Sequence, residues 1–129
     1  MKTLTIIAVI IISIGSLIGY KAYQSRQPGS FDELAQCLTN NRVKMYGAYW
    51  CPHCQSQKKA FGRSWKYIDY VECALPGGKG QTKECDDAKI EGYPTWVNKD
   101  DKRLSGEQSM SALAELGGCA LVTSSNGVE

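Results

Sequence analysis

Histidine is almost absent from this sequence of 129 residues, in which His53 is the only one. Closed zinc sites commonly use two Cys-x-x-Cys pairs, or one such pair together with two histidines. Here a single Cys-x-x-Cys motif runs from Cys51 to Cys54, and His53 lies inside it. The sequence therefore disfavours a structural zinc site, and we expect neither a metal nor another bound cofactor.

The sequence also lacks an excess of charge, an internal repeat and a phosphate-binding motif. Its formal net charge is +2, and acidic and basic residues are interspersed, which excludes the basic footprint of a nucleic-acid-binding protein. The glycine-rich run over residues 77–82 does not have the spacing of a phosphate-binding loop. A substrate-facing or partner-facing loop is the expected role of this run. The length leaves room for one small domain.

Charge is missing altogether from Thr3 to Tyr20, a stretch of 18 residues that includes eight Ile or Val. A helix of that length reaches about 27 Å, close to the roughly 30 Å of a membrane's hydrocarbon layer. The bulky residues that follow do not form the small-residue pattern of a signal-peptidase site. We predict a transmembrane anchor, or an uncleaved signal, over residues 1–23; a cleaved signal peptide is the alternative.

Six cysteines occur in the chain, and all of them follow the hydrophobic segment. An even, high number of cysteines behind an export-like segment is typical of a compartment in which disulfides persist. We therefore predict a single-pass membrane protein whose domain lies on the extracytoplasmic side.

Helix and strand patterns alternate after a short linker over residues 24–29. Ser30 and Glu33 have the spacing of a capping box, and apolar residues at helical spacing predict a helix from Phe31 to about Leu38. The further expected elements are a strand over 43–50, a helix over 52–65, strands over 67–72, 95–97 and 103–105, a short helix over 81–89, and a last helix capped by Ser109.

This order predicts an α/β domain over residues 30–120, with a central mixed sheet flanked by helices. The first two strands enclose a helix, so we expect them to be parallel. The last two are close enough in sequence to form an antiparallel hairpin. Residues 121–129 are expected to be a frayed tail.

Cys51 and Cys54 lie where the first strand gives way to a helix. Thiol–disulfide exchange needs an exposed thiolate that attacks and a second thiol that resolves the mixed disulfide. The unpaired N–H groups of a helix start would stabilise the Cys51 thiolate, and Cys54 lies one turn further on. Pro52 suits the first helical position, and a protonated His53 would favour the reduced pair and so make the disulfide a stronger oxidant. A purely structural disulfide and a metal site are the alternatives.

The region 31–119 is similar to the thioredoxin-like domain fused to, or paired with, bacterial homologues of vitamin K epoxide reductase. The resemblance rests on the runs Lys44–Trp50 with the Cys51–Cys54 motif, Pro76–Gln81, Glu91–Trp96 and Leu104–Gln108. It implies a thioredoxin-like fold and exchange with cysteine-containing polypeptides and with a quinone-linked membrane oxidoreductase. Because this chain has one candidate span, we expect the quinone site in a separate vitamin K epoxide reductase-like protein.

The resemblance also assigns roles around the motif. It makes Pro94 a cis-proline that faces Cys51 and leaves the Tyr93 backbone free to pair with an extended substrate. Trp50 adjoins the attacking sulfur and is expected to contact substrate.

The four other cysteines allow three pairings. Cys73 ends a predicted strand and Cys85 lies in the next predicted helix, so a Cys73–Cys85 bridge would close the glycine-rich loop. In this fold the ends of the first and last helices can lie near each other, which makes Cys37–Cys119 the other expected structural disulfide; alternatively, one pair relays electrons to Cys51–Cys54.

Met45 departs from the pattern, because thioredoxins carry a buried Asp or Glu at this position. A thioether cannot take a proton from Cys54, so we expect water or another group to do so. Together with His53 this favours an anchored oxidase of thiols in exported proteins. The competing hypotheses are a reductase or isomerase that uses the same pair, and a non-catalytic anchored module that binds a metal or a partner.

Overall fold

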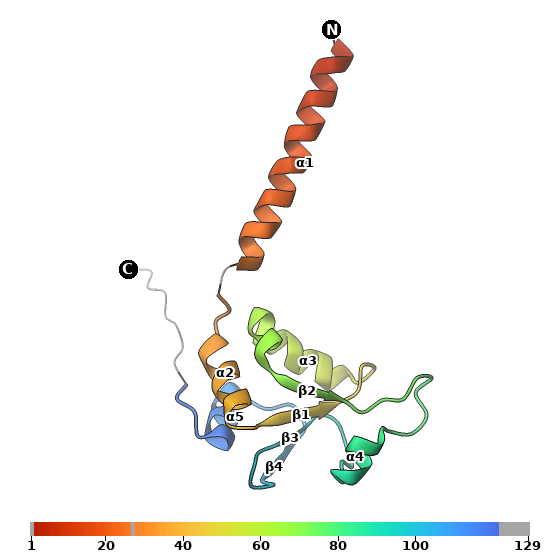
Figure 1. Ribbon diagram of the computed structural model, residues 1–129, viewed down its shortest axis with the longest axis vertical. Helices are drawn as coiled ribbons and strands as arrows, with labels where there is room; N and C mark the ends of the chain where they lie inside the picture. The colour runs from red at the N-terminus through yellow and green to blue at the C-terminus, as the bar shows by residue number, and fades with distance from the viewer. Residues whose placement is uncertain (1, 27, 122–129) are drawn as a thin grey trace.

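The computed structural model describes residues 2–26 and 28–121. Apart from Leu121, the tail predicted over 121–129 lies outside the described residues. A long N-terminal helix, α1, stands away from an α/β domain (Figure 1).

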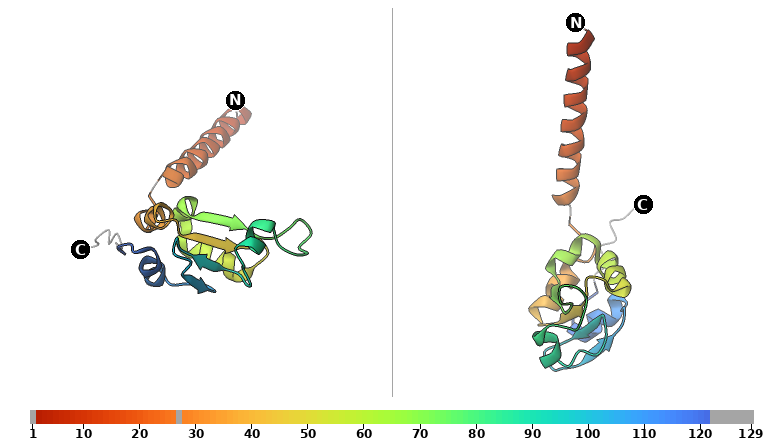
Figure 2. Two further views of the ribbon diagram at one scale, coloured as in Figure 1. Left: turned by 60° about the horizontal axis from the view of Figure 1, so that its bottom comes forward. Right: turned by 90° about the vertical axis from the view of Figure 1, so that its right-hand side faces the viewer.

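Helix α1 spans Lys2–Arg26 and so includes the first part of the segment predicted as a linker. Its stretch Thr5–Tyr23 has a mean hydropathy of 1.9, and none of it is buried. Both views of Figure 2 show it projecting from the domain. By length and composition it is the one helix among the described residues that could cross a membrane, and a signal sequence would have the same properties.

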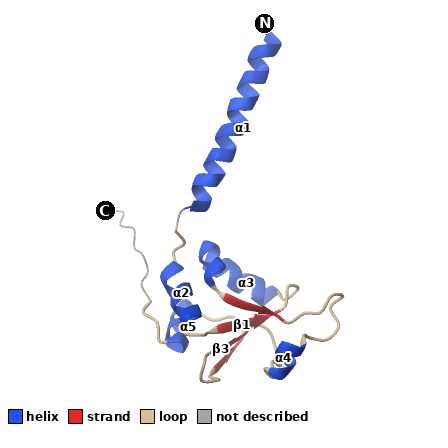
Figure 3. Ribbon diagram, in the orientation of Figure 1, coloured by secondary structure: helices blue, strands red, loops and turns tan. Residues whose placement is uncertain are grey.

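Four strands form one mixed sheet, as the sequence predicts (Figure 3). They are β1 (Lys44–Gly47), β2 (Asp69–Glu72), β3 (Thr95–Val97) and β4 (Arg103–Ser105). The spatial order is β2-β1-β3-β4, with β1 parallel to β2 and antiparallel to β3. Strands β3 and β4 form the antiparallel hairpin expected from their short connection. The predicted thioredoxin-like architecture of a mixed sheet flanked by helices is confirmed.

The capping box predicted at Ser30 is wrong. Helix α2 spans Asp32–Asn40, its N-cap position is occupied by Phe31, and no side chain caps it. The Phe31 N–H instead donates to the Ser64 hydroxyl at 3.0 Å, and the Asp32 carboxylate accepts from the Gly29 N–H at 3.0 Å. An acceptor that is distant in sequence, in the 3-10 segment over Gly62–Tyr67, has replaced the local cap.

Strand β1 is shorter than predicted, because it ends at Gly47 instead of reaching Trp50. Tyr49 and Trp50 lie in a turn and are 54% and 50% exposed. The Glu72 carboxylate accepts the Tyr49 N–H at 3.2 Å in place of a sheet partner. This turn leads the chain from the end of β1 to the start of the next helix.

The helix predicted over 52–65 is divided. Helix α3 spans Pro52–Phe61, and the 3-10 helix η1 follows over Gly62–Tyr67. Gly62 has φ of +55°, a conformation outside the α-helix that glycine adopts without steric cost, and it ends α3. Because η1 extends to Tyr67, β2 begins later than predicted.

The sequence predicted the last helix more accurately than the short helix before it. Helix α4 spans only Lys83–Asp87, shorter than the predicted 81–89, and Lys89 at φ +53° lies beyond its end. Helix α5 spans Met110–Gly117 and is capped as predicted, with the Ser109 hydroxyl accepting the Ala112 N–H at 3.1 Å.

The alternation of side chains along the strands separates two apolar clusters, one on each face of the sheet. Met45 and Trp96 belong to the main cluster, which also receives the apolar residues of α2, α3 and α5. Tyr46 and Val71 belong to the smaller cluster, under α4. Cys51 and Cys54 lie in the main cluster.

Candidate functional site

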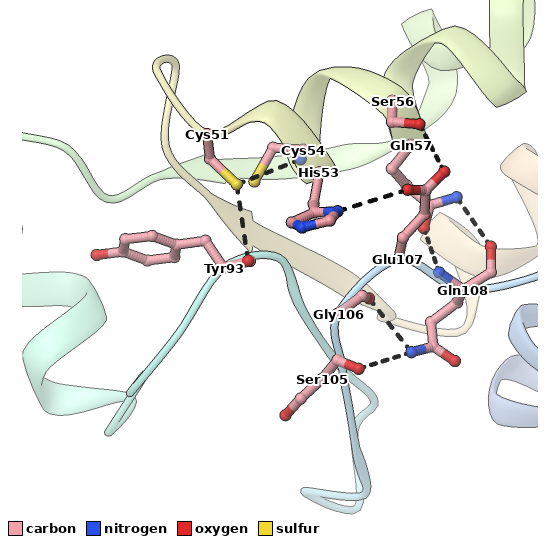
Figure 4. Close-up of polar contacts among 10 residues, drawn as sticks. All are labelled: Cys51, His53, Cys54, Ser56, Gln57, Tyr93, Ser105, Gly106, Glu107 and Gln108. Atoms are coloured by element: carbon pink, nitrogen blue, oxygen red, sulfur yellow. Dashed lines mark hydrogen bonds and ion pairs between the residues drawn. The ribbon is translucent and has the colours of Figure 1, made fainter.

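The Cys51–Cys54 pair lies at the start of α3, and both cysteines are free (Figure 4). Cys51 occupies the N-cap position, and Pro52 is the first residue of the helix. The Cys51 Sγ accepts the Cys54 N–H at 3.3 Å. A sulfur that carries negative charge here meets an unpaired backbone N–H and the positive end of the helix dipole. The arrangement suits a thiolate nucleophile.

Cys51 is less accessible than the sequence suggested. The expected exposed sulfur belongs to a residue that is only 4% exposed, and Cys54 is fully buried. The Cys51 thiol also donates to the Tyr93 carbonyl oxygen at 3.6 Å. The loop that carries Tyr93 therefore covers the sulfur, a tertiary contact that no local pattern reveals.

Trp50, Tyr93 and Pro94 gather around Cys51. The Tyr93–Pro94 peptide bond is cis. The rings of Trp50 and Tyr93 meet edge to face with centroids 6.0 Å apart. The structure thus brings the three residues assigned to substrate binding to one side of the motif.

Gln81 anchors this group and was not singled out in the sequence. Its side-chain oxygen accepts the Tyr93 hydroxyl at 2.7 Å, and its amide nitrogen donates to the Ile90 carbonyl at 3.0 Å. Burial, followed by the negative charges of Asp86 and Glu72, raises the pKa of Tyr93 and keeps its hydroxyl a donor. The glycine-rich run therefore ends at a residue that holds the loop over Cys51.

Cys54 is held in its neutral form. Burial, the first cause, and the hydrogen bond with Cys51 raise the pKa of Cys54 to about 12. Met45, at the position where thioredoxins carry a carboxylate, is itself fully buried in the main cluster. The resolving thiol therefore has to lose its proton before it can attack.

His53 lies on the exposed side of the motif, with a ring nitrogen directed toward Glu107 (Figure 4). Its side chain is 72% exposed, and its Nδ1 lies 3.8 Å from the Glu107 carboxylate. Glu107 also accepts the Ser56 hydroxyl at 2.7 Å. Sequence reasoning missed Glu107, for which the only signal was its place in the family run Leu104–Gln108.

Gln57 ties α3 to the segment that follows β4, and no sequence pattern had identified this residue. Its buried amide exchanges two hydrogen bonds with the backbone of Gln108, at 2.7 and 3.1 Å. The nearby Gly106 N–H donates to the Pro94 carbonyl at 2.7 Å. One segment after β4 therefore positions both α3 and the cis-proline loop.

The four remaining cysteines form two disulfides, Cys37–Cys119 and Cys73–Cys85. Cys73 and Cys85 belong to the smaller cluster, on the sheet face opposite Cys51 and Cys54. Within residues 2–26 and 28–121, no three His, Cys, Asp or Glu side chains are grouped so that they could hold a metal ion.

The chain is similar to the thiol-disulfide oxidoreductase LTO1 of Arabidopsis thaliana. The two sequences are 50% identical over 92 residues, which are 68% of this chain and 24% of the relative. The chain therefore spans about a quarter of the length of that relative. No protein-family model matches the chain.

Proposed function

We propose that this protein is a membrane-anchored thiol–disulfide oxidoreductase that oxidises cysteine thiols of exported polypeptides. The observation that carries the proposal is the free Cys51–Cys54 pair, with Cys51 at the helix N-cap and the Tyr93–Pro94 loop against its sulfur. The similarity to a protein named thiol-disulfide oxidoreductase supports the same chemistry.

The pair acts by two exchanges at Cys51. A substrate thiolate attacks Cys51 of the disulfide form, and Cys54 leaves; a second substrate thiolate then releases Cys51 and takes away the disulfide. Pro52 restricts the turn between the two sulfurs. The Tyr93 backbone and the exposed Trp50 ring are the proposed contacts for the substrate chain beside Cys51.

A charge on His53 favours oxidation over reduction. A protonated His53 adds positive charge next to Cys51 and stabilises the reduced, thiolate form of the pair, which makes the disulfide a stronger oxidant. Met45 supplies no carboxylate, so the proton of Cys54 has to go to a group outside β1 in either direction. The reduced pair then needs an acceptor, and by resemblance this is a quinone-linked, vitamin K epoxide reductase-like membrane protein.

Helix α1 supports anchoring of the domain in a membrane, because its apolar surface is fully exposed and long enough to span the hydrocarbon layer. The two further disulfides support an extracytoplasmic location, where disulfides persist. The sheet separates Cys73–Cys85 from the working pair, which supports a structural role for this disulfide over an electron relay.

A redox titration of Cys51–Cys54 against glutathione tests the direction. A reduction potential toward about −120 mV is expected, whereas one near about −270 mV would identify a reductase. A Cys54→Ser variant should trap mixed disulfides through Cys51, and the double variant Cys51→Ser/Cys54→Ser is the control. Absence of trapped species, with metal copurifying, would identify a non-catalytic binding module instead.

A further inference from the structure

Cys54 has to exchange a proton in every catalytic cycle, and β1 offers no group that could take it on the face toward Cys54. The residue of β1 at the expected position is Met45, whose thioether neither gives nor accepts a proton usefully. The parallel register pairs Met45 with Tyr70, and Gly47 with Glu72. Strand β2 therefore places the polar side chains of Tyr70 and Glu72 beside Met45 and Gly47, which offer no acid or base.

Gly47 has no side chain, and this leaves a small gap between Cys54 and Tyr70. A Cβ atom at Gly47 would lie 3.0 Å from the Cys54 Sγ, 2.9 Å from the Tyr70 ring and 3.4 Å from the Tyr70 hydroxyl oxygen. The thiol and the hydroxyl thus border the same small gap, which any larger residue would fill. Tyr70 is the nearest hydroxyl group to this gap.

Tyr70 and Glu72 are joined by a short hydrogen bond. They alternate with Val71 along β2 and share one face, on which the Tyr70 hydroxyl donates to the Glu72 Oε2 at 2.8 Å. The other carboxylate oxygen, Oε1, accepts the N–H groups of Tyr49 and Ala74 at 3.2 and 2.9 Å. These bonds hold the carboxylate in place and leave Oε2 to the tyrosine.

The remaining charged and titratable groups around Cys54 come from α3 and the cis-proline loop. Lys58 places its Nζ 4.0 Å from the centre of the Tyr70 ring, and its positive charge favours the Cys54 thiolate. Cys51 and Tyr93 are the other titratable neighbours that interact with Cys54. Of these groups, Glu72 is the one that can accept a proton through Tyr70.

We propose that Tyr70 and Glu72 form a proton relay for Cys54, in which Tyr70 exchanges the proton with the thiol and Glu72 stores it. This inference rests on the proposed function, because it concerns the resolution of a mixed disulfide at Cys51. The relay takes the place of the buried carboxylate that Met45 has displaced.

The step balances as follows in the direction that reduces a partner disulfide. Cys54 gives its proton to the Tyr70 oxygen while Tyr70 gives its own proton to the Glu72 carboxylate. The Cys54 sulfur attacks the Cys51 sulfur, the Cys51–Cys54 bond forms, and the bond from Cys51 to the partner sulfur breaks. The partner leaves as a thiolate with that electron pair and is reduced, the two protein thiols are oxidised, and Glu72 later releases the proton to solvent. Oxidation of a substrate runs the same steps in reverse.

The test follows the reaction of the reduced full-length protein with oxidised glutathione. Formation of the Cys51–glutathione adduct and its decay to the Cys51–Cys54 disulfide are measured separately, by acid quenching and mass spectrometry from pH 6 to 10. In Tyr70→Phe and Glu72→Gln we expect adduct formation to stay within about twofold of the unchanged protein. Adduct decay at pH 7 should slow by roughly tenfold to a hundredfold, as expected for loss of positioned proton transfer, with the difference shrinking as pH rises.

Three comparisons make the result specific. Tyr67→Phe removes a phenol hydroxyl from η1 and should change neither rate. The double variant Tyr70→Phe/Glu72→Gln should be no slower than the slower single variant, because a relay fails as a unit. Loss of a negative charge alone would favour the nearby thiolate, so slower decay in Glu72→Gln cannot come from the field of the carboxylate.

The relay is overturned if adduct decay is unchanged in both single variants, or if formation and decay slow by the same factor at every pH. Failure of the proposed function looks different, because the unchanged protein would then form neither the adduct nor the Cys51–Cys54 disulfide.

Discussion

At the scale of single residues, Cys51 and Cys54 share one motif but occupy different environments. Cys51 caps a helix and accepts a backbone N–H, whereas Cys54 is fully buried beside Gly47 and Tyr70. This difference divides the roles of the two sulfurs. Cys51 is positioned to exchange with a partner, and Cys54 stays protonated until it attacks Cys51.

The pH dependence of alkylation checks the state of Cys54. In a Cys51→Ser variant Cys54 is the only free thiol that iodoacetamide can alkylate, because the other four cysteines are in disulfides. Burial, the largest cause of the raised pKa of about 12, persists in this variant, and below that value the thiol is neutral. We expect the rate, followed by mass spectrometry, to rise about tenfold per pH unit from pH 7 to beyond 9. A plateau near pH 9 would contradict the raised pKa.

His53 is placed to tune the redox potential without affecting packing, since its side chain is largely exposed. In His53→Ala we expect the reduction potential of Cys51–Cys54 to fall by about 30 mV, because a side chain that can carry positive charge near the thiolate is lost. Titration against glutathione measures the reduction potentials of the variant and of the unchanged protein. Lys59→Ala, which removes a charge from the far end of α3, should leave the potential unchanged.

At the scale of elements, α3 is positioned from outside itself. The buried Gln57 amide ties it to the backbone at Gln108, and the neighbouring Gly106 ties the same segment to Pro94. The Tyr93 side chain is tied in turn to Gln81. The geometry at Cys51 therefore depends on segments that are distant in sequence.

Replacing Gln57 by Leu tests the first of these ties. The change leaves the Gln108 N–H and carbonyl without their partners, so we expect a loss of about 1–3 kcal/mol in the free energy of unfolding. Urea unfolding of the oxidised protein measures it. Gln36→Leu, the same substitution at an exposed position of α2, should stay within about 0.5 kcal/mol. Equal effects of the two changes would show that the Gln57–Gln108 pair has no special contribution.

The Cys73–Cys85 bond links residues 12 apart and closes the glycine-rich loop. In Cys73→Ser/Cys85→Ser we expect a loss of about 3 kcal/mol in the free energy of unfolding, because a constraint on the unfolded chain is removed. The rate of exchange with glutathione, per folded molecule, should not change. A selective loss of turnover in a folded variant would instead support an electron relay through this pair.

At the scale of the whole molecule, α1 and the domain contribute separate properties. The exposed helix presents Ile10 and Ile14 among its apolar residues, and the domain carries the redox pair at the start of α3. Localisation and chemistry can therefore be altered independently.

Charges placed in α1 should detach the protein from membranes. Each Lys at the centre of a spanning helix costs about 2.5–3.5 kcal/mol, so Ile10→Lys/Ile14→Lys should lose insertion into phospholipid vesicles. Flotation of vesicles with the bound protein measures this, and glutathione exchange should be unaffected. Ile10→Leu/Ile14→Leu is the matched control and should insert like the unchanged chain. Equal flotation of the two variants would contradict a spanning role.

Local sequence patterns predicted much of the domain. Strands β3 and β4, the Ser109 cap and the parallel β1–β2 pair follow from apolar alternation, turn residues and the handedness of crossover connections. The position of Cys51 and Pro52 at a helix start was likewise readable from a short motif. These features depend on neighbours within a few residues, so the local chain carries them.

Tertiary structure decided what local patterns could not. Ser64 replaced the predicted cap at Ser30, and Gly62 divided the helix after Phe61. Tyr93 covers Cys51, and Tyr70 lies close to Cys54. Each of these contacts joins segments that are far apart in the sequence. The chain by itself determined that two thiols lie at a helix start. Packing decided that one is a helix cap covered by a loop and the other a buried neutral thiol, because desolvation and hydrogen bonding depend on which distant groups surround each sulfur.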